Sequence, residues 1–226
     1  MIYFDKVSKI YSATSIALED VSFTIAPNEF ISLVGQSGAG KSTLLKLLLA
    51  EDRPTSGKVF FESSDVHALS RRELPFLRRR IGAVFQDYRL LPHKTAYENI
   101  AFALEAAGKS EDDIAQDVPQ VLELVGLMDK AWHFPNQLSG GEKQRVAIAR
   151  AIVTSPDVVI ADEPTGNLDP LNTWEIIKLL EKINDLGTTI ILATHDKEII
   201  NTLRRRVVTL EKGRLVRDEQ RGRYVL

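Results

Sequence analysis

Short apolar runs in this chain alternate with longer segments whose apolar residues recur every three or four positions, an order typical of an α/β fold. The runs that predict strands are 2–7, 21–25, 30–34, 158–161 and 188–193. The helical spacing predicts helices over about 41–48, 138–152 and 171–186. Near the end, two apolar stretches flank Lys212-Gly213, which predicts a hairpin of 207–210 with 214–217.

The middle third of the chain has a different pattern. Helical spacing covers Tyr97–Ala107 and Asp113–Val125, and the second stretch follows acidic residues that suit the positive end of a helix dipole. We therefore expect a single domain over 1–226. Within it, an α/β core with a β subdomain, 1–85 and 138–226, is expected to enclose a helical subdomain at about 86–137.

Composition narrows the classes of function. Lysine and arginine number 29 against 31 aspartate and glutamate, so the net charge of −2 argues against nucleic acid as the main partner. The chain has no cysteine, which excludes disulfides, thiolate metal sites and cysteine nucleophiles. No signal-peptide pattern follows Met1, and no apolar run approaches the ~18–20 residues that span a bilayer. We expect an intracellular domain that reaches a membrane only through a partner.

The segment Gly35–Ser42 fits the pattern G-x-x-x-x-G-K-[ST] between an apolar strand and a helix. Its glycines let several backbone N–H groups converge on one phosphate, and the helix N-terminus adds partial positive charge. Lys41 would supply a cation to the β- and γ-phosphates, and the Ser42 hydroxyl would ligate Mg²⁺. The alternative is a glycine-rich turn with a chance lysine. The candidate nucleotide-binding residues here are Ser37, Gly38, Ala39, Gly40, Lys41, Ser42 and Thr43.

Two carboxylates, Asp162 and Glu163, end the apolar strand at 158–161. Burying paired carboxylates is costly, and a bound Mg²⁺ would offset their charge. Asp162 would hold the metal, through water, and Glu163 would polarise the attacking water. Two solvated acids at a strand end are the alternative. Together with the phosphate loop, the pair indicates a P-loop NTPase, and both patterns are shared by kinases, GTPases and motors.

A second helix start, at Ser139-Gly140-Gly141, lies 23 residues before Asp162 (162 − 139 = 23). Its N–H groups could also bind phosphate, which would be redundant within one chain. A head-to-tail homodimer removes the redundancy, because each Ser139 helix would complete the site formed by the other chain's Lys41 loop. The alternative is an ordinary Ser139 cap with Glu142 closing a capping box, which leaves the two glycines unexplained.

The order of these motifs resembles that of the ATPase subunits of ABC transporters over nearly the whole chain. The matching series is the phosphate loop, Gln86, 138–142, Asp162-Glu163, 167–169 and His195. The resemblance implies the ABC ATPase fold, which is an α/β P-loop core with an antiparallel β subdomain and a helical insertion. It implies ATP and Mg²⁺ as cofactors. It also implies that Tyr11 stacks on adenine, that Gln86 touches the metal, that His195 contacts the γ-phosphate, and that Asp169 bridges subunits.

Within that family, the stretches 72–82 and 85–91 resemble the bacterial cell-division branch, the FtsE group, and 161–169 is shared more widely. This resemblance implies a membrane partner of the FtsX type, control of cell-wall hydrolases, and a peripheral location on the cytoplasmic face of the inner membrane. Lipoprotein release and peptide or macrolide export remain alternatives. A soluble P-loop ATPase or phosphotransferase without a membrane partner is a third, which would not require the Ser139 element.

Apolar residues follow Gln86 where a loop is usually polar: Leu90, Leu91, Pro92 and Tyr97. Exposed apolar patches mark contact sites, so a cytoplasmic helix of the membrane partner could dock there. The alternative is that these residues cap the local core. The arginines at 71–72, 78–80 and 204–206 are interpreted as solvated faces, with an anionic membrane surface as the alternative.

Overall fold

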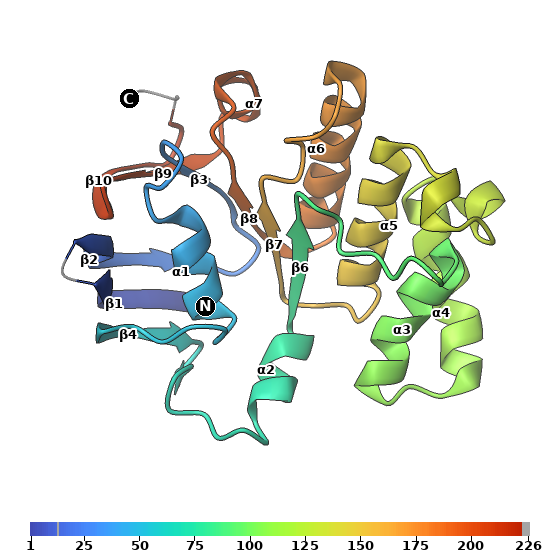
Figure 1. The fold of residues 1–226 in the computed structure, drawn as a ribbon, viewed down its shortest axis with the longest axis horizontal. Coiled ribbons are helices and arrows are strands. Elements are labelled where there is room, and N and C mark those ends of the chain that lie inside the picture. Colours follow the sequence, from blue (N-terminus) through green and yellow to red (C-terminus); the bar gives the residue numbers. More distant parts are fainter. Residues whose placement is uncertain (13, 223–226) are drawn as a thin grey trace. The chain divides into compact units, whose positions relative to one another are not determined.

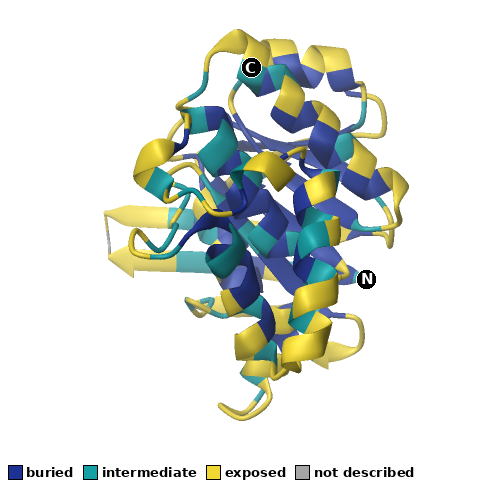
Figure 2. Ribbon diagram, turned by 90° about the vertical axis from the view of Figure 1, so that its right-hand side faces the viewer, coloured by how far each residue is buried: buried dark blue, intermediate teal, exposed yellow. Residues whose placement is uncertain are grey.

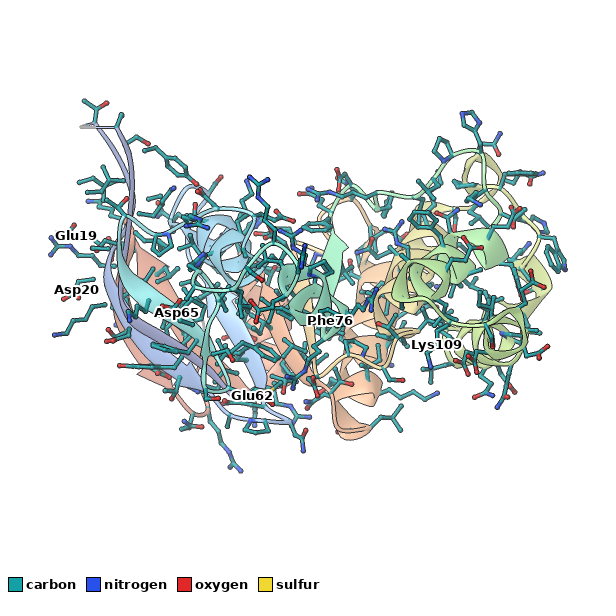
Figure 3. The ribbon with its side chains drawn as sticks, turned by 90° about the horizontal axis from the view of Figure 1, so that it is seen from below. Glu19, Asp20, Glu62, Asp65, Phe76 and Lys109 are labelled. Atoms are coloured by element: carbon teal, nitrogen blue, oxygen red, sulfur yellow. The ribbon has the colours of Figure 1, made fainter. Side chains whose placement is uncertain are left out.

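The computed structural model describes residues 1–12 and 14–222 and divides the chain into two compact units. The first unit is Met1–Arg78 together with Thr188–Leu226, and the second is Arg79–Gly187. The short helix α2 (Leu74–Arg79) lies where the chain passes from the first unit to the second. Its Phe76 is exposed to solvent (Figure 3).

An antiparallel sheet forms one layer of the first unit, with strand order β2-β1-β4-β5 (Figure 1). Alternate residues face the core, so that Phe4 is buried and stacks on Phe23 with ring centroids 4.8 Å apart, whereas Tyr3 is exposed. The strands are β1 (Ile2–Ser12), β2 (Ser15–Ile25), β4 (Ser56–Phe61) and β5 (Ser64–Asp65). β2 begins earlier than the expected 21–25, because pairing with β1 continues through its mostly exposed first half.

Four strands form the other layer of the first unit, in the order β10-β9-β3-β8; β9, β3 and β8 are parallel, and β10 pairs antiparallel with β9. Every residue of β3 is buried between parallel neighbours, as its unbroken apolar run predicts. Figure 2 shows buried residues on the interior strands and exposed residues on the outer faces of the helices. The elements are β3 (Phe30–Val34), α1 (Lys41–Leu48), β8 (Thr189–Ala193), α7 (Lys197–Leu203), β9 (Arg206–Glu211) and β10 (Arg214–Glu219). The predicted hairpin is confirmed. α7 was not predicted, although Asp196 supplies its N-cap.

A buried arginine, Arg206, fastens β9, so the expectation of a solvated face at 204–206 is wrong for this residue. Arg206 donates to Asp218 on β10 at 2.7 Å and to Glu29 at 2.9 Å, and it also reaches the Thr24 carbonyl at 2.8 Å. Its hydrogen bond to Asp218 raises its pKa above the ordinary value, so it carries its charge at every relevant pH. A buried charge is tolerated only when it is paired in this way.

The second unit contains a parallel pair of strands and a group of helices. The predicted helices of the middle third are present, and α3 packs against both α4 and α5 (Figure 1). The elements are β6 (Ile81–Phe85), α3 (Ala96–Ala107), α4 (Glu111–Leu124), the 3₁₀ turns η1 (Met128–Lys130) and η2 (Pro135–Gln137), α5 (Gly140–Ile152), β7 (Val158–Asp162) and α6 (Pro170–Asp185). Lys109, in the turn between α3 and α4, is exposed (Figure 3).

None of the helices in the described ranges 1–12 and 14–222 has the length and apolarity that crossing a membrane requires.

Candidate functional site

The loop between β3 and α1 has the tightly curled backbone that a phosphate cradle needs. Gly40 has φ +105, and a Cβ there would lie 2.5 Å from the Ala17 carbonyl on β2. Gly35 is equally confined, since a side chain would collide with the Leu210 carbonyl on β9. Only glycine fits at these two positions, so the loop lies directly on β2 and β9 with its N–H groups gathered at the start of α1.

Lys41 is bound to this loop by its own ammonium group. Its Nζ donates to the Gly35 carbonyl at 2.8 Å and to the Gln36 carbonyl at 3.4 Å, and the residue is only 6% exposed. These carbonyls hold the ammonium group over the loop, where a bound anion could accept hydrogen bonds from it. The start of α1 has no acidic residue in its first turn and no side-chain cap, so its dipole is not offset locally. The residues present therefore fit a bound nucleotide phosphate.

Other predicted residues of the first unit lie on neighbouring elements. Ser42 is exposed and Thr43 half-buried in the first turn of α1. His195 is exposed directly after β8, before the cap of α7. Tyr11, on β1, is 53% exposed, and its hydroxyl donates to Asp52 at 2.8 Å. The first unit thus contains the phosphate loop, the predicted base-stacking residue and the predicted γ-phosphate contact.

A cavity of about 160 Å³ adjoins the phosphate loop. It is lined by loop residues and by the β9–β10 turn: Gln36, Ser37, Gly38, Ala39, Glu211 and Lys212. The turn supports the loop, because the N–H of Gly213 donates to the Ala39 carbonyl at 3.2 Å. The β9–β10 hairpin therefore fixes the outer side of the phosphate loop.

The predicted carboxylate pair lies at the carboxyl end of β7, in the second unit. Asp162 is the last residue of β7 and pairs in register with Phe85 on β6. Glu163, which is half-buried, has φ +49, an uncommon left-handed conformation for a residue with a side chain. Such backbone strain concentrates at functional positions, because it persists only where the surroundings impose it.

Gln86, which follows β6, is held by Asn167, a residue for which no role was predicted. The Gln86 side-chain amide donates to Asn167 Oδ1 at 3.2 Å, and the Asn167 amide donates back to the Gln86 carbonyl at 3.2 Å. Gly166 leaves room for this pair, since a Cβ there would lie 2.7 Å from Gln86 Nε2. The two residues are 81 positions apart in the chain, and no local pattern indicates that they pair.

The start of α5 is closed by its own residues. Ser139 Oγ accepts from the Glu142 N–H at 3.2 Å, and the Glu142 carboxylate accepts from the Ser139 N–H at 2.7 Å. This confirms the capping box, which was the alternative to a phosphate site. The pKa of Glu142 is lowered by the hydrogen bond from the Ser139 backbone, so the carboxylate is ionised at neutral pH beside the helix start.

The structure also gives a packing reason for the two glycines. A Cβ on Gly141 would overlap the side-chain oxygen of Asn172, and a Cβ on Gly140 would lie 3.2 Å from the Tyr88 hydroxyl. Asn172 is held in turn by Asp169, which caps α6 and accepts from the N–H groups of Leu171 and Asn172 at 3.0 Å each. Asp169 is exposed, and its pKa is lowered, first by the backbone hydrogen bond from Asn172. Asn172 is a residue that sequence reasoning missed.

The loop after Gln86 is fastened by buried side chains. Arg150, on α5, donates to the carbonyls of Arg89 at 2.7 Å and Tyr88 at 3.0 Å, both of which have positive φ. Asn99, fully buried on α3, donates to the Leu91 carbonyl at 3.1 Å and accepts from its N–H at 2.8 Å. The loop conformation is therefore imposed by α3 and α5.

The residues expected to form a docking patch are less exposed than their sequence suggests. Leu90, Leu91 and Tyr97 are half-buried, and Pro92 is exposed. Tyr97 stacks on Trp132, which is 69% exposed, with ring centroids 4.8 Å apart. Trp132 adds an exposed aromatic surface that no sequence pattern indicated.

Comparisons with known proteins agree with this architecture. The family model of the ABC transporter matches residues 18–166. The cell division ATP-binding protein FtsE of Bacillus subtilis is 54% identical over 99% of this chain and 98% of that protein. The protein of the same name from Mycobacterium tuberculosis is 56% identical over 99% of this chain and 98% of that protein. The one from Escherichia coli is 51% identical over 95% of this chain and 97% of that protein.

Solved structures extend the likeness to the fold. The dimeric structure of the ATP-binding cassette MJ0796 in a post-hydrolysis state, bound to ADP and Pi, has a TM-score of 0.87 at 35% identity and covers 99% of this chain and 100% of that one. The structure of cbiO1 from Clostridium perfringens, part of the ABC transporter complex cbiONQ, has a TM-score of 0.88 at 34% identity and covers 97% and 88%. The predicted fold class is confirmed.

The phosphate loop, its lysine and the P-loop fold define a nucleotide-binding ATPase. The matching model and the identities with curated relatives place the chain more narrowly: it belongs to the ABC transporter family and is an ATP-hydrolysing member of that family.

Proposed function

We propose that this chain is the ATPase subunit of a membrane complex that acts in bacterial cell division. The observation that carries the proposal is an ATP site of the expected build in a chain that is 51% to 56% identical, over nearly its full length, to cell division ATP-binding proteins. The open helix start at α1 and the loop-bound Lys41 supply the nucleotide site.

Each predicted site residue has a proposed role in the chemistry. Lys41 and the loop N–H groups bind the β- and γ-phosphates, and Tyr11 stacks on the base. Glu163 polarises the attacking water, and His195 contacts the γ-phosphate. The oxygens that would hold Mg²⁺ are those of Ser42, Gln86 and Asp162, hard ligands of the type that this ion prefers. Bound there, the ion offsets phosphate charge.

ATP would drive two copies of the chain together head to tail. The support is the dimeric MJ0796 cassette with ADP and Pi, and a second helix start, at α5, that its own chain does not need for its nucleotide. Ser139, Gly140, Gly141 and Asp169 would face the nucleotide site of the other copy. The capping box leaves the N–H groups of Gly140 and Gly141 without a side-chain acceptor from Ser139 or Glu142, so those groups can approach a phosphate.

The closure of the dimer would move an integral membrane protein of the FtsX type to which this chain is bound. The same partner would keep this chain peripheral on the cytoplasmic face of the membrane. We place its docking near Gln86, Leu90, Leu91 and Tyr97, where the Tyr97–Trp132 pair offers an exposed aromatic edge. The alternative is the ATPase of a lipoprotein-release or export transporter, which would use the same site with a different partner. Co-purification of the tagged chain identifies the partner and decides between them.

The catalytic proposal is tested with Glu163→Gln, which keeps the side-chain shape and removes the charge. We expect ATP binding to persist, turnover to fall by about 100-fold or more, and a stable dimer to form with ATP. Phosphate release measures turnover, and size-exclusion chromatography measures the dimer. The matched control is Glu123→Gln on the exposed face of α4. Wild-type turnover in Glu163→Gln would contradict the role of Glu163.

A further inference from the structure

Two polar side chains of the first unit, those of Asp52 and Lys9, contact Tyr11 in a way that the ATPase chemistry does not use. The Tyr11 hydroxyl donates to Asp52 Oδ2 at 2.8 Å. Lys9 Nζ donates to Asp52 Oδ1 at 2.6 Å and to the Arg53 carbonyl at 2.8 Å. The same Nζ lies 4.8 Å from the centre of the Tyr11 ring. Asp52 therefore holds the phenol at its tip, and Lys9 lies against the ring.

This contact connects Tyr11 to the helix that carries the phosphate loop. Asp52 lies just beyond the end of α1, where the N–H of Glu51 donates to the Lys46 carbonyl at 2.9 Å. Burial raises the pKa of Tyr11 above its ordinary value, and the hydrogen bond to Asp52 raises it further. The phenol is thus tied to the segment that follows the phosphate-loop helix.

The charge state of Asp52 suits this role. Burial acts to raise its pKa, and the hydrogen bonds from Lys9 and Tyr11 outweigh burial, so the pKa lies below its ordinary value. The carboxylate is ionised at neutral pH and accepts both bonds at once. Despite these ties the Tyr11 ring is more than half exposed, so it is held in place without being covered.

We propose that Asp52, together with Lys9, is a positioning residue that fixes the Tyr11 ring at the place where the base of a nucleoside triphosphate stacks. An unrestrained tyrosine on a strand end would have to lose rotamer freedom when the base binds, and a ring already held does not. The inference rests on the proposed function, because it assumes that the phosphate loop binds ATP and that Tyr11 meets its base.

Two single variants and their combination test the proposal. Tyr11→Phe keeps the ring and removes the hydroxyl, and Asp52→Ala removes the acceptor. Each should weaken ATP binding by about 3- to 10-fold, a part of what base stacking contributes. The double variant should be no weaker than the worse single one, because both remove the same tie. Glu51→Ala, which removes the neighbouring exposed carboxylate, should bind ATP like the parent.

The decisive comparison is between ATP and inorganic tripolyphosphate, which has the phosphates and no base. Titration calorimetry in the Glu163→Gln background measures both dissociation constants without hydrolysis. We expect the affinity for tripolyphosphate to change by less than about twofold in every variant, because its binding does not involve the ring. Equal weakening of both ligands would overturn the proposal, since Asp52 would then act through α1.

Unchanged affinity for ATP in both single variants would also overturn it. Thermal unfolding of each variant identifies any general loss of fold, and Tyr11→Phe alone carries the test if Asp52→Ala does not fold. Failure of the background protein to bind either ligand would instead overturn the proposed function, and this inference with it.

Discussion

Two helix starts in this protein, those of α1 and α5, are built from similar small residues and differ in what closes them. α1 has no acid in its first turn and no side-chain cap, and its first residue is a lysine folded back over the loop. α5 is closed by Ser139 and Glu142, which place a negative charge at the same end of the helix dipole. An open start can bind an anion within its own chain, whereas a capped start attracts one only weakly.

The difference assigns separate roles to the two starts. α1 would hold the nucleotide before any partner arrives. α5 would meet a phosphate only when a second copy brings it close, which makes its contribution conditional on the dimer. Because the start of α5 is capped, it does not compete with α1 for the nucleotide of its own chain. Because it is lined by glycines, its N–H groups can still bind a phosphate that a second copy brings close.

The largest effect is expected at the open start. Lys41→Ala removes the buried cation and should weaken ATP binding by about 10- to 100-fold, because charge-assisted bonds to phosphate contribute about 1.5–3 kcal/mol. Calorimetric titration with ATP measures the change. Lys46→Ala, the other lysine of α1 and an exposed one, is the matched control. If Lys41→Ala bound ATP as tightly as the parent, the start of α1 would not be the nucleotide site.

A middle effect is expected at the capped start. Gly141→Ala puts a methyl group where Asn172 lies, so Asn172 must leave Asp169, at a cost of about 1–3 kcal/mol in stability. ATP-driven dimerisation should weaken by roughly tenfold while ATP binding by the monomer is kept. Sedimentation in the Glu163→Gln background measures the dimer. Gly126→Ala is a control for general strain, since its φ of +69 is unfavourable but no atom lies within 4 Å of the added Cβ. If Gly141→Ala dimerised as strongly as the parent, the start of α5 would not be part of the dimer interface.

The smallest effect concerns the charge at the cap. Glu142→Gln can keep the hydrogen bond to the Ser139 N–H and removes the negative charge, so ATP-driven dimerisation should tighten by about two- to fivefold. The same sedimentation assay measures it, with Glu123→Gln as the control. If Glu142→Gln dimerised more weakly than the parent, the Glu142 carboxylate itself would contribute to the interface. The free N–H groups at the start of α5 would then not explain dimerisation.

The pH dependence of stability provides a second readout of that cap. The pKa of Glu142 is lowered in the folded chain, so its carboxylate stabilises the fold above the unfolded pKa of about 4.3, and this contribution is lost as the pH falls through the lower folded value. The difference in melting temperature between the parent and Glu142→Gln should therefore narrow below about pH 4. A difference that does not change with pH would contradict the role of the ionised cap.

Much of the fold was readable because its signals are local. The unbroken apolar run at β3, the glycine pattern before Lys41 and the helical spacing of α5 and α6 each depend on neighbours a few residues away. α7 escaped prediction because it is short. The first half of β2 escaped because its mixed residues form a strand only through pairing with β1. The partner residues of the site were missed for a similar reason, since Asn167 meets Gln86 across 81 positions and Asp52 meets Tyr11 across 41.

The residues along the chain are enough to predict that α1 begins at a phosphate-binding loop and that α5 begins with a Ser139–Glu142 cap. Both features are set by backbone geometry within a few residues, where side-chain chemistry acts directly on the nearest N–H groups. The reason why Gly141 must be a glycine, the residue that holds Gln86, and the contacts that fix the ring of Tyr11 are visible only in the folded structure. Those answers depend on which distant side chains the sheets and helices bring into contact, and no spacing along the chain records that.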